Sequence, residues 1–231
     1  MSDTPRIEVT VAAPVDAVWD ALRDKDKIRH WHGWEYEGLD SEIDQIFFSE
    51  AVEGDRTLEL QAGGDRISLV PRGGHTVVTL TRAPHGSDPE WEAYYDDITE
   101  GWTTFLHQLK FALERQPDAV RRTLFFAGYT GSAGDVADEL GLTDVGSPYR
   151  ATLVGEKVAG ELWFRSANQL GVTVDAWGEG LLIVAHTPPS DAKPKGAAMA
   201  VLSTYGLDQS TFDDLNSRWT AWWAERYPGD S

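Results

Sequence analysis

Hydrophobic and polar positions alternate at the start of the chain and then change period. The segment RIEVTV, residues 6–11, alternates apolar and polar side chains, which is the period of a half-buried strand. Pro14 suits a helix start, and the apolar residues of VDAVWDALRD then fall on one helical face. KDKIRHW continues into another helical turn. The pattern predicts one strand followed by short helices.

The next part of the chain has the pattern of a β-meander, in which short strand-like runs are separated by turn-forming residues. The runs IDQIFFSE, RTLELQ, RISLVPR and HTVVTLTR are separated by VEGD, AGGD and GG, which favour tight turns. We predict a strand in each run. A long helix follows, because the apolar positions Ile98, Trp102, Phe105, Leu109 and Ala112 recur at spacings of three and four residues. Pro117 is expected to end this helix.

The same order of patterns then starts again. RTLFF predicts a strand and GDVADEL a short helix, and five strands are predicted in YRATLVGE, VAGELWFRS, LGVTVDAW, LLIVAHT and AAMAVLSTY. STFDDLNSRWTAWWAERYP has the pattern of an amphipathic helix that Pro228 stops. Each half is therefore expected to run from a strand through short helices and a meander to a long helix.

Two pairs of segments support an internal repeat. VWDAL at residues 18–22 corresponds to VADEL at residues 136–140, and DDITEGWTTFLHQL at residues 96–109 corresponds to DDLNSRWTAWWAER at residues 213–226. The separation along the chain is the same for both pairs to within one residue, which favours a tandem duplication. We predict two domains, residues 1–117 and 118–231, with the joint near residues 116–121.

This pattern predicts an α+β fold in each half, a curved antiparallel sheet wrapped around a long C-terminal helix. The sheet is concave and the helix meets it along one stripe, so space remains between them. That space is either filled by side chains or left as a ligand cavity.

Composition narrows the classes of function. Hydrophobic residues make up 41% of the 231 residues, and the ten tryptophans indicate a folded core. The net charge of −18 repels phosphate backbones and anionic lipids, so we expect neither a nucleic-acid partner nor membrane insertion. The absence of cysteine excludes disulfides, a thiolate nucleophile and cysteine-based metal sites. With no leader-like start and no long apolar run, we expect a cytoplasmic protein.

The opening APVDAVWDAL resembles that of the helix-grip superfamily known as SRPBCC or START-like. The sequence is most similar to homologues of the activator of the 90-kDa heat-shock protein ATPase, whose domains continue with a Trp-containing stretch, here IRHWHGWE, and end in a Trp- and Leu-rich helix. The resemblance implies two tandem helix-grip domains with a largely apolar pocket between sheet and final helix. The second half lacks the opening proline and an HWHGW segment, so it resembles a diverged copy.

Several residues could carry chemistry, and each has a structural alternative. His30 and His32 could supply part of a metal site, but no further ligands stand at recognisable spacing, so we expect no metal and histidines that face solvent. The pairs Asp96–Asp97 and Asp213–Asp214 could be paired acids, yet adjacent helical residues point about 100° apart. We therefore interpret both pairs as capping residues in a first helical turn.

The leading functional hypothesis is binding of a small hydrophobic or aromatic molecule, without a cofactor, in the cavity of the first domain. The residues expected to line it are Trp31, Trp34, Phe48, Tyr94, Trp102 and Phe105. Two alternatives stay open, a cofactor-independent enzyme of the cyclase or dehydratase type with unidentified catalytic residues, and an interaction protein with a chaperone or other protein partner. No nucleophile-elbow, phosphate-loop or dinucleotide motif is present.

Overall fold

A computed structural model describes residues 5–60, 64–83, 89–130, 136–191 and 193–229. Side chains in the last helix of the first half are described from Asp97 onward. The chain divides into two compact units, Met1–Asp118 and Ala119–Ser231. Each unit is considered by itself below.

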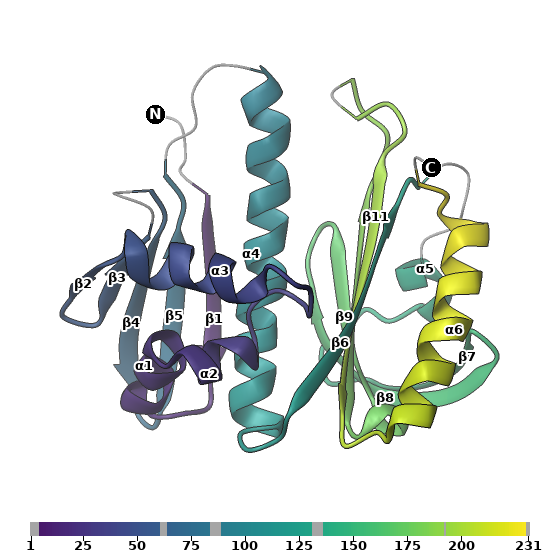
Figure 1. Cartoon of the computed structure of the whole chain (residues 1–231), viewed down its shortest axis with the longest axis horizontal. Coiled ribbons are helices and arrows are strands. Elements are labelled where there is room, and N and C mark those ends of the chain that lie inside the picture. Colours follow the sequence, from purple (N-terminus) through teal and green to yellow (C-terminus); the bar gives the residue numbers. More distant parts are fainter. Residues whose placement is uncertain (1–4, 61–63, 84–88, 131–135, 192, 230–231) are drawn as a thin grey trace. The chain divides into compact units, whose positions relative to one another are not determined.

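The first unit is a five-stranded antiparallel sheet with three short helices and one long helix (Figure 1). Its elements are β1 (Arg6–Val11), α1 (Val15–Arg23), α2 (Lys25–Arg29), α3 (Leu39–Asp44), the π-helical turn η1 (Gln45–Ser49), β2 (Val52–Gly54), β3 (Thr57–Glu59), β4 (Arg66–Arg72), β5 (His75–Thr81) and α4 (Pro89–Arg115). The strand order is β1-β5-β4-β3-β2, so the strand that opens the unit pairs with the last strand of the meander.

The second unit is a six-stranded antiparallel sheet that ends in one long helix. Its elements are β6 (Arg121–Gly128), α5 (Val136–Leu140), β7 (Pro148–Leu153), β8 (Glu156–Arg165), β9 (Gln169–Val174), the 3-10 turn η2 (Asp175–Trp177), β10 (Gly180–Thr187), β11 (Ala197–Tyr205) and α6 (Gln209–Arg226). The order β6-β11-β10-β9-β8-β7 again closes the first strand onto the last.

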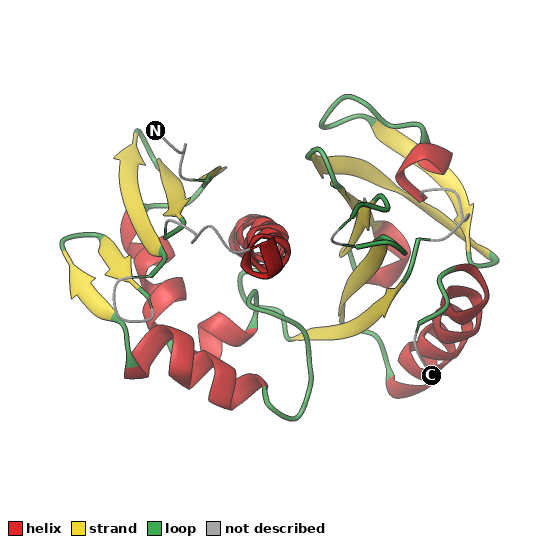
Figure 2. Ribbon diagram, turned by 90° about the horizontal axis from the view of Figure 1, so that it is seen from above, coloured by secondary structure: helices red, strands yellow, loops and turns green. Residues whose placement is uncertain are grey.

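In both units the core lies between one sheet face and the long helix. In the second unit a row of buried aliphatic side chains crosses five strands at paired positions, Leu124, Leu202, Leu182, Val172 and Leu162. The row packs in one cluster with the buried side chains of α6, namely Phe212, Leu215, Trp219 and Trp223. Figure 2 shows how a long helix lies along each sheet. The fold class predicted from the sequence, two helix-grip units of α+β type, is confirmed.

The repeated Trp-Thr segments occupy corresponding places in the two units. Trp102 of α4 and Trp219 of α6 are both buried in the core cluster of their own unit. The duplication itself stays a prediction from the sequence.

The strand predicted in IDQIFFSE is wrong. Leu39–Asp44 forms α3, and the chain continues through η1 to Ser49. The physical reason is the spacing of the apolar residues: Ile43 and Phe47 are fully buried four residues apart, with Ile46 packed beside them, as on one face of a helix. The high strand propensity of Ile and Phe does not overcome this tertiary arrangement.

Gly160 of β8 lies close to the backbone of Thr173 in β9. A Cβ atom at this position would lie 2.0 Å from the backbone oxygen of Thr173, whereas one at Gly101 in α4 would meet nothing nearer than 3.9 Å. We expect Gly160→Ala to destabilise the second unit by about 2–3 kcal/mol through overpacking. Gly101→Ala should instead stabilise α4 by about 0.5–1 kcal/mol, because alanine loses less entropy in a helix.

Hydrogen exchange of the backbone amides in β8, β9 and α4 measures both effects. Equal effects of the two substitutions would contradict the packing described for Gly160.

Candidate functional site

A tight turn after α2 places Trp31 and His32 inside the first unit. The side chain of Asp24 caps α2 by accepting hydrogen bonds from the backbone N–H groups of Asp26 and Lys27. At the other end, the backbone N–H groups of Trp31 and His32 both donate to the carbonyl oxygen of Ile28, at 3.1 and 2.8 Å. The chain is thereby held close to the helix end, and both side chains are buried.

Aromatic rings surround His32. Together they form what we call the ring cluster: Trp31, His32, Trp34, Phe47, Trp102 and Phe105. The imidazole centroid lies 4.6 Å from that of Phe105 and 5.1 Å from that of Phe47. Residues from α4 and from the α2–η1 segment thus meet at one point, although they are far apart in the sequence.

The polar side of His32 is occupied by a carboxylate. His32 Nε2 lies 3.2 Å from Glu42 Oε1, and the Tyr36 hydroxyl donates to Glu42 Oε2 at 2.5 Å. The hydrogen bond from His32 lowers the pKa of Glu42, so the carboxylate accepts from both neighbours. The hydrogen bond that the Tyr36 hydroxyl donates to Glu42 raises the pKa of Tyr36 to about 12. Histidine, glutamate and tyrosine therefore form one hydrogen-bonded chain from core to surface.

The structure brings together four of the six side chains expected to line a cavity. Trp31, Trp34, Trp102 and Phe105 belong to the ring cluster. Trp31 is fully buried, and its indole N–H donates to the Ala21 carbonyl oxygen, so it is a core residue. Phe48 is exposed and lies under the guanidinium of Arg23.

The sixth residue, Tyr94, falls in the first part of α4. Its side chain lies outside the described residues.

The expectation that both histidines face solvent is wrong for His32, which has no exposed surface. The imidazole is buried because Glu42 supplies a partner for its polar edge while aromatic rings cover the remainder. The sequence analysis did not identify Glu42 as a site residue. The available signal was the four-residue spacing of Leu39 and Ile43, which fits one face of a helix that includes Glu42. Within the described residues, no group of three or more histidine or acidic side chains is placed to hold a metal ion.

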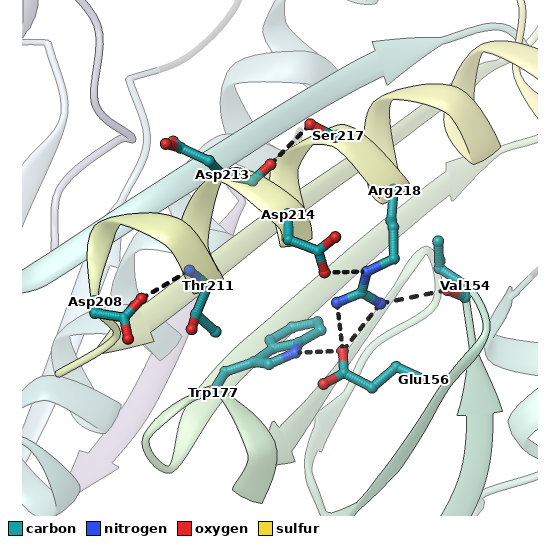
Figure 3. Close-up of polar contacts among 9 residues, drawn as sticks. All are labelled: Val154, Glu156, Trp177, Asp208, Thr211, Asp213, Asp214, Ser217 and Arg218. Atoms are coloured by element: carbon teal, nitrogen blue, oxygen red, sulfur yellow. Dashed lines mark hydrogen bonds and ion pairs between the residues drawn. The ribbon is translucent and has the colours of Figure 1, made fainter.

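The interpretation of the aspartate pairs as helix caps is also wrong. The residue that caps α6 is Asp208, which accepts a hydrogen bond from the Thr211 backbone N–H at 2.8 Å (Figure 3). Asp213 and Asp214 lie one turn further along, where Asp214 pairs with Arg218 at 2.8 Å. In α4, Asp97 lies well past the helix start at Pro89, and the Asp96 side chain lies outside the described residues.

Figure 3 shows a second polar network in which Glu156 is central. Glu156 Oε2 accepts hydrogen bonds from Trp177 Nε1 and Arg218 Nη2, both at 3.3 Å. Arg218 Nη1 also donates to the carbonyl oxygen of Val154 at 3.4 Å. The network therefore connects α6 to the β7–β8 turn and to η2.

Comparison with known proteins gave structural neighbours only. No protein-family model matches the sequence, and a search of curated proteins gave no match. Among solved structures, DynU16 from the dynemicin biosynthetic locus is 18% identical over 96% of both chains, with a TM-score of 0.38. The Aha1 dimer of Colwellia psychrerythraea is 15% identical and covers 49% of this chain and 98% of its own, with a TM-score of 0.37.

A third neighbour is the di-domain ARO/CYC protein StfQ from the steffimycin biosynthetic pathway. It is 12% identical over 96% of this chain and 92% of its own, with a TM-score of 0.34. At such identities and scores, the activities of these proteins are not carried over to this chain. No described helix is long and apolar enough to cross a membrane. The helix-grip resemblance noted in the opening motif is confirmed at the level of fold by the elements of the two units.

The hydrogen bond between Glu42 and the buried His32 predicts a pH-dependent stability. Its pKa is lowered in the folded protein, so its contribution is present above the unfolded-state value near 4.5 and is lost as pH falls through the lower folded value. Glu42→Gln should cost about 1–2 kcal/mol at pH 7, since it weakens the hydrogen bonds from His32 and Tyr36.

Urea-induced unfolding between pH 3 and 7 measures the difference between wild type and Glu42→Gln, which should shrink toward pH 3. Glu37→Gln is the control, because it makes the same change at an exposed acid that forms no ion pair with a described residue. A difference that stays constant with pH would contradict the assignment.

Proposed function

We propose that the first unit binds a small, neutral hydrophobic or aromatic molecule at the edge of the ring cluster. The observation that carries the proposal is the partial exposure of Trp34 and Phe105, whose ring centroids lie 6.4 Å apart. Phe105 in turn contacts the buried His32 ring, so aromatic surface continues from solvent into the core. Rings presented in this way can stack on a planar ligand.

The charge of the surroundings supports a neutral ligand. Glu35 and Glu37 flank the exposed Tyr36 in the segment between Trp34 and α3, and both are exposed. The carboxylate of Glu42 is already bound by His32 and Tyr36. An anionic ligand would be repelled by these carboxylates, whereas a neutral aromatic molecule would not be repelled.

The hydrogen-bonded chain favours a second candidate, cofactor-independent acid–base catalysis of the cyclase or dehydratase type. A carboxylate that accepts from the histidine Nε2–H orients the imidazole and increases its basicity, as in many general bases. Such an enzyme must first remove a proton from the carbon next to a carbonyl group. The complete burial of His32 means that a covering ring such as Phe105 must move before substrate reaches the imidazole. Binding is therefore the better-supported function.

Ligand binding can be tested with naphthalenemethanol, a neutral aromatic probe. Trp34→Ala and Phe105→Ala should each weaken its affinity about tenfold, since each removes a stacking surface. Phe48→Ala is the matched control, because Phe48 is an exposed aromatic outside the ring cluster, and it should leave the affinity unchanged. Proton–nitrogen correlation NMR of isotope-labelled protein measures both the affinity and the response of the Trp34 indole. Equal binding by all three variants would refute the proposal.

Catalysis is tested separately by deuterium exchange into the α-carbon of naphthylacetone. If the second candidate is correct, the wild-type protein accelerates exchange and His32→Gln abolishes the acceleration, with Tyr36→Phe reducing it less. If the wild-type protein binds the ketone but exchange proceeds at the buffer rate, the first unit binds without catalysing this step.

A further inference from the structure

The second unit has an open pocket of about 590 Å³ between the β7–β8 hairpin and η2. Eight residues line it, Arg150, Ala151, Thr152, Lys157, Val158, Ala159, Asp175 and Ala176. The volume is within the range of small-molecule sites. All of the lining belongs to the second unit, so this pocket is separate from the ring cluster.

The pocket lies beside the part of β8 that does not pair with β9. β8 pairs with β7 from Glu156 to Glu161, but its pairing with β9 begins only at Leu162 and contains a register shift before Phe164. Such an irregularity bends a strand away from its neighbour. The first half of β8 therefore has β7 on one side and, on the other, the chain that turns into η2.

The Glu156 network, drawn in Figure 3, links η2 and the β7–β8 turn, the two segments beside the pocket. Trp177 belongs to η2, and its hydrogen bond to Glu156 ties that wall to the start of β8. Val154, in the β7–β8 turn, has a φ of +50°, a conformation that is unfavourable for a β-branched residue. Its carbonyl oxygen accepts from Arg218, which also pairs with Glu156. The hairpin is thus held in a strained but anchored geometry, as at many binding sites.

Two cations and a hydroxyl share one face of the hairpin. Arg150 is paired with Ala159 and Thr152 with Lys157, and residues at paired or alternate positions of an antiparallel hairpin point to the same side. Among the residues that the structure describes, neither Arg150 nor Lys157 forms an ion pair. In a chain with a net charge of −18, two cations that line a pocket without a carboxylate partner are available to an anion.

Asp175 lies in the opposite wall and limits the charge that the pocket accepts. Burial raises the pKa of the Tyr149 phenol in β7, and the negative charge of Asp175 adds to this effect. The lining therefore carries two positive charges and one negative charge. This net charge matches a monovalent carboxylate better than a doubly charged phosphate, and Asp175 can accept a hydrogen bond from a ligand hydroxyl.

We propose that this pocket binds a small organic monocarboxylate, with the carboxylate between Arg150 and Lys157. Arginine binds carboxylates through two parallel N–H donors, and Thr152 adds a third donor beside them. Ala159, which shares the face of Arg150, and Ala176 offer apolar surface for the body of the ligand. The two units would then select ligands of different charge, neutral in the first and anionic in the second.

The test is titration of the full chain with naphthoate at fixed, low ionic strength, followed by NMR of the β7 and β8 amides. Arg150→Gln and Lys157→Gln should each weaken binding about five- to tenfold, whereas Asp175→Asn should strengthen it about twofold or more. Arg72→Gln is the matched control, because it removes one exposed strand cation from the first unit and should have no effect. Inorganic phosphate should compete poorly.

Three results would overturn the proposal. They are unchanged affinity in both Arg150→Gln and Lys157→Gln, equal weakening in Arg72→Gln, and equal affinity for naphthoate and naphthalenemethanol at the β7–β8 amides. Phe105→Ala should leave naphthoate binding intact, so failure at the ring cluster and failure at this pocket are distinguishable. Retained amide dispersion in each variant confirms that the second unit is folded.

Discussion

Burial of one sheet face against one long helix is the constraint on which each unit depends. An antiparallel sheet with an apolar face cannot remain exposed, and in the second unit α6 covers it with Trp219 and Trp223, one turn apart. In the first unit α4 supplies Trp102 and Leu106 to the equivalent core. Because this burial is local to each unit, the remaining surfaces are free to differ. The ring cluster and the β7–β8 pocket are two such differences.

The sequence predicted the fold well where the period of apolar residues was unambiguous. The alternation in residues 6–11 gave β1, and the three- and four-residue spacing around Trp102 and Trp219 gave the two long helices. It failed in residues 43–50, where a short apolar run is compatible with either a strand or a helix. There the decision is made by packing, since Ile43 and Phe47 enter the core from one helical face.

The candidate site was only partly predictable, because it depends on hydrogen bonds between polar residues that are distant in the sequence. Aromatic residues near the opening motif could be named as a group because their hydrophobicity is intrinsic to each side chain. The burial of His32 depends instead on Glu42, which lies ten residues away in α3, and no local pattern signals that pairing. The same applies to Glu156, whose role follows from contacts with Trp177 and Arg218 that are distant in sequence. The corrected role of the aspartate pairs has a similar origin, because the position of a helix start depends on tertiary context.

The two sheets differ most at the edge opposite their opening strand. In the first unit the edge hairpin consists of β2 and β3, three residues each, which present little side-chain surface. In the second unit the corresponding β7 and β8 have six and ten residues. The edge strand β7 has no outer neighbour, so lengthening it does not disturb the core row of paired aliphatic residues, which ends at Leu162 of β8. A longer hairpin can also bend away from the sheet once pairing with β9 is broken. A charged pocket lining can therefore arise at this edge without any change in the helix that stabilises the unit.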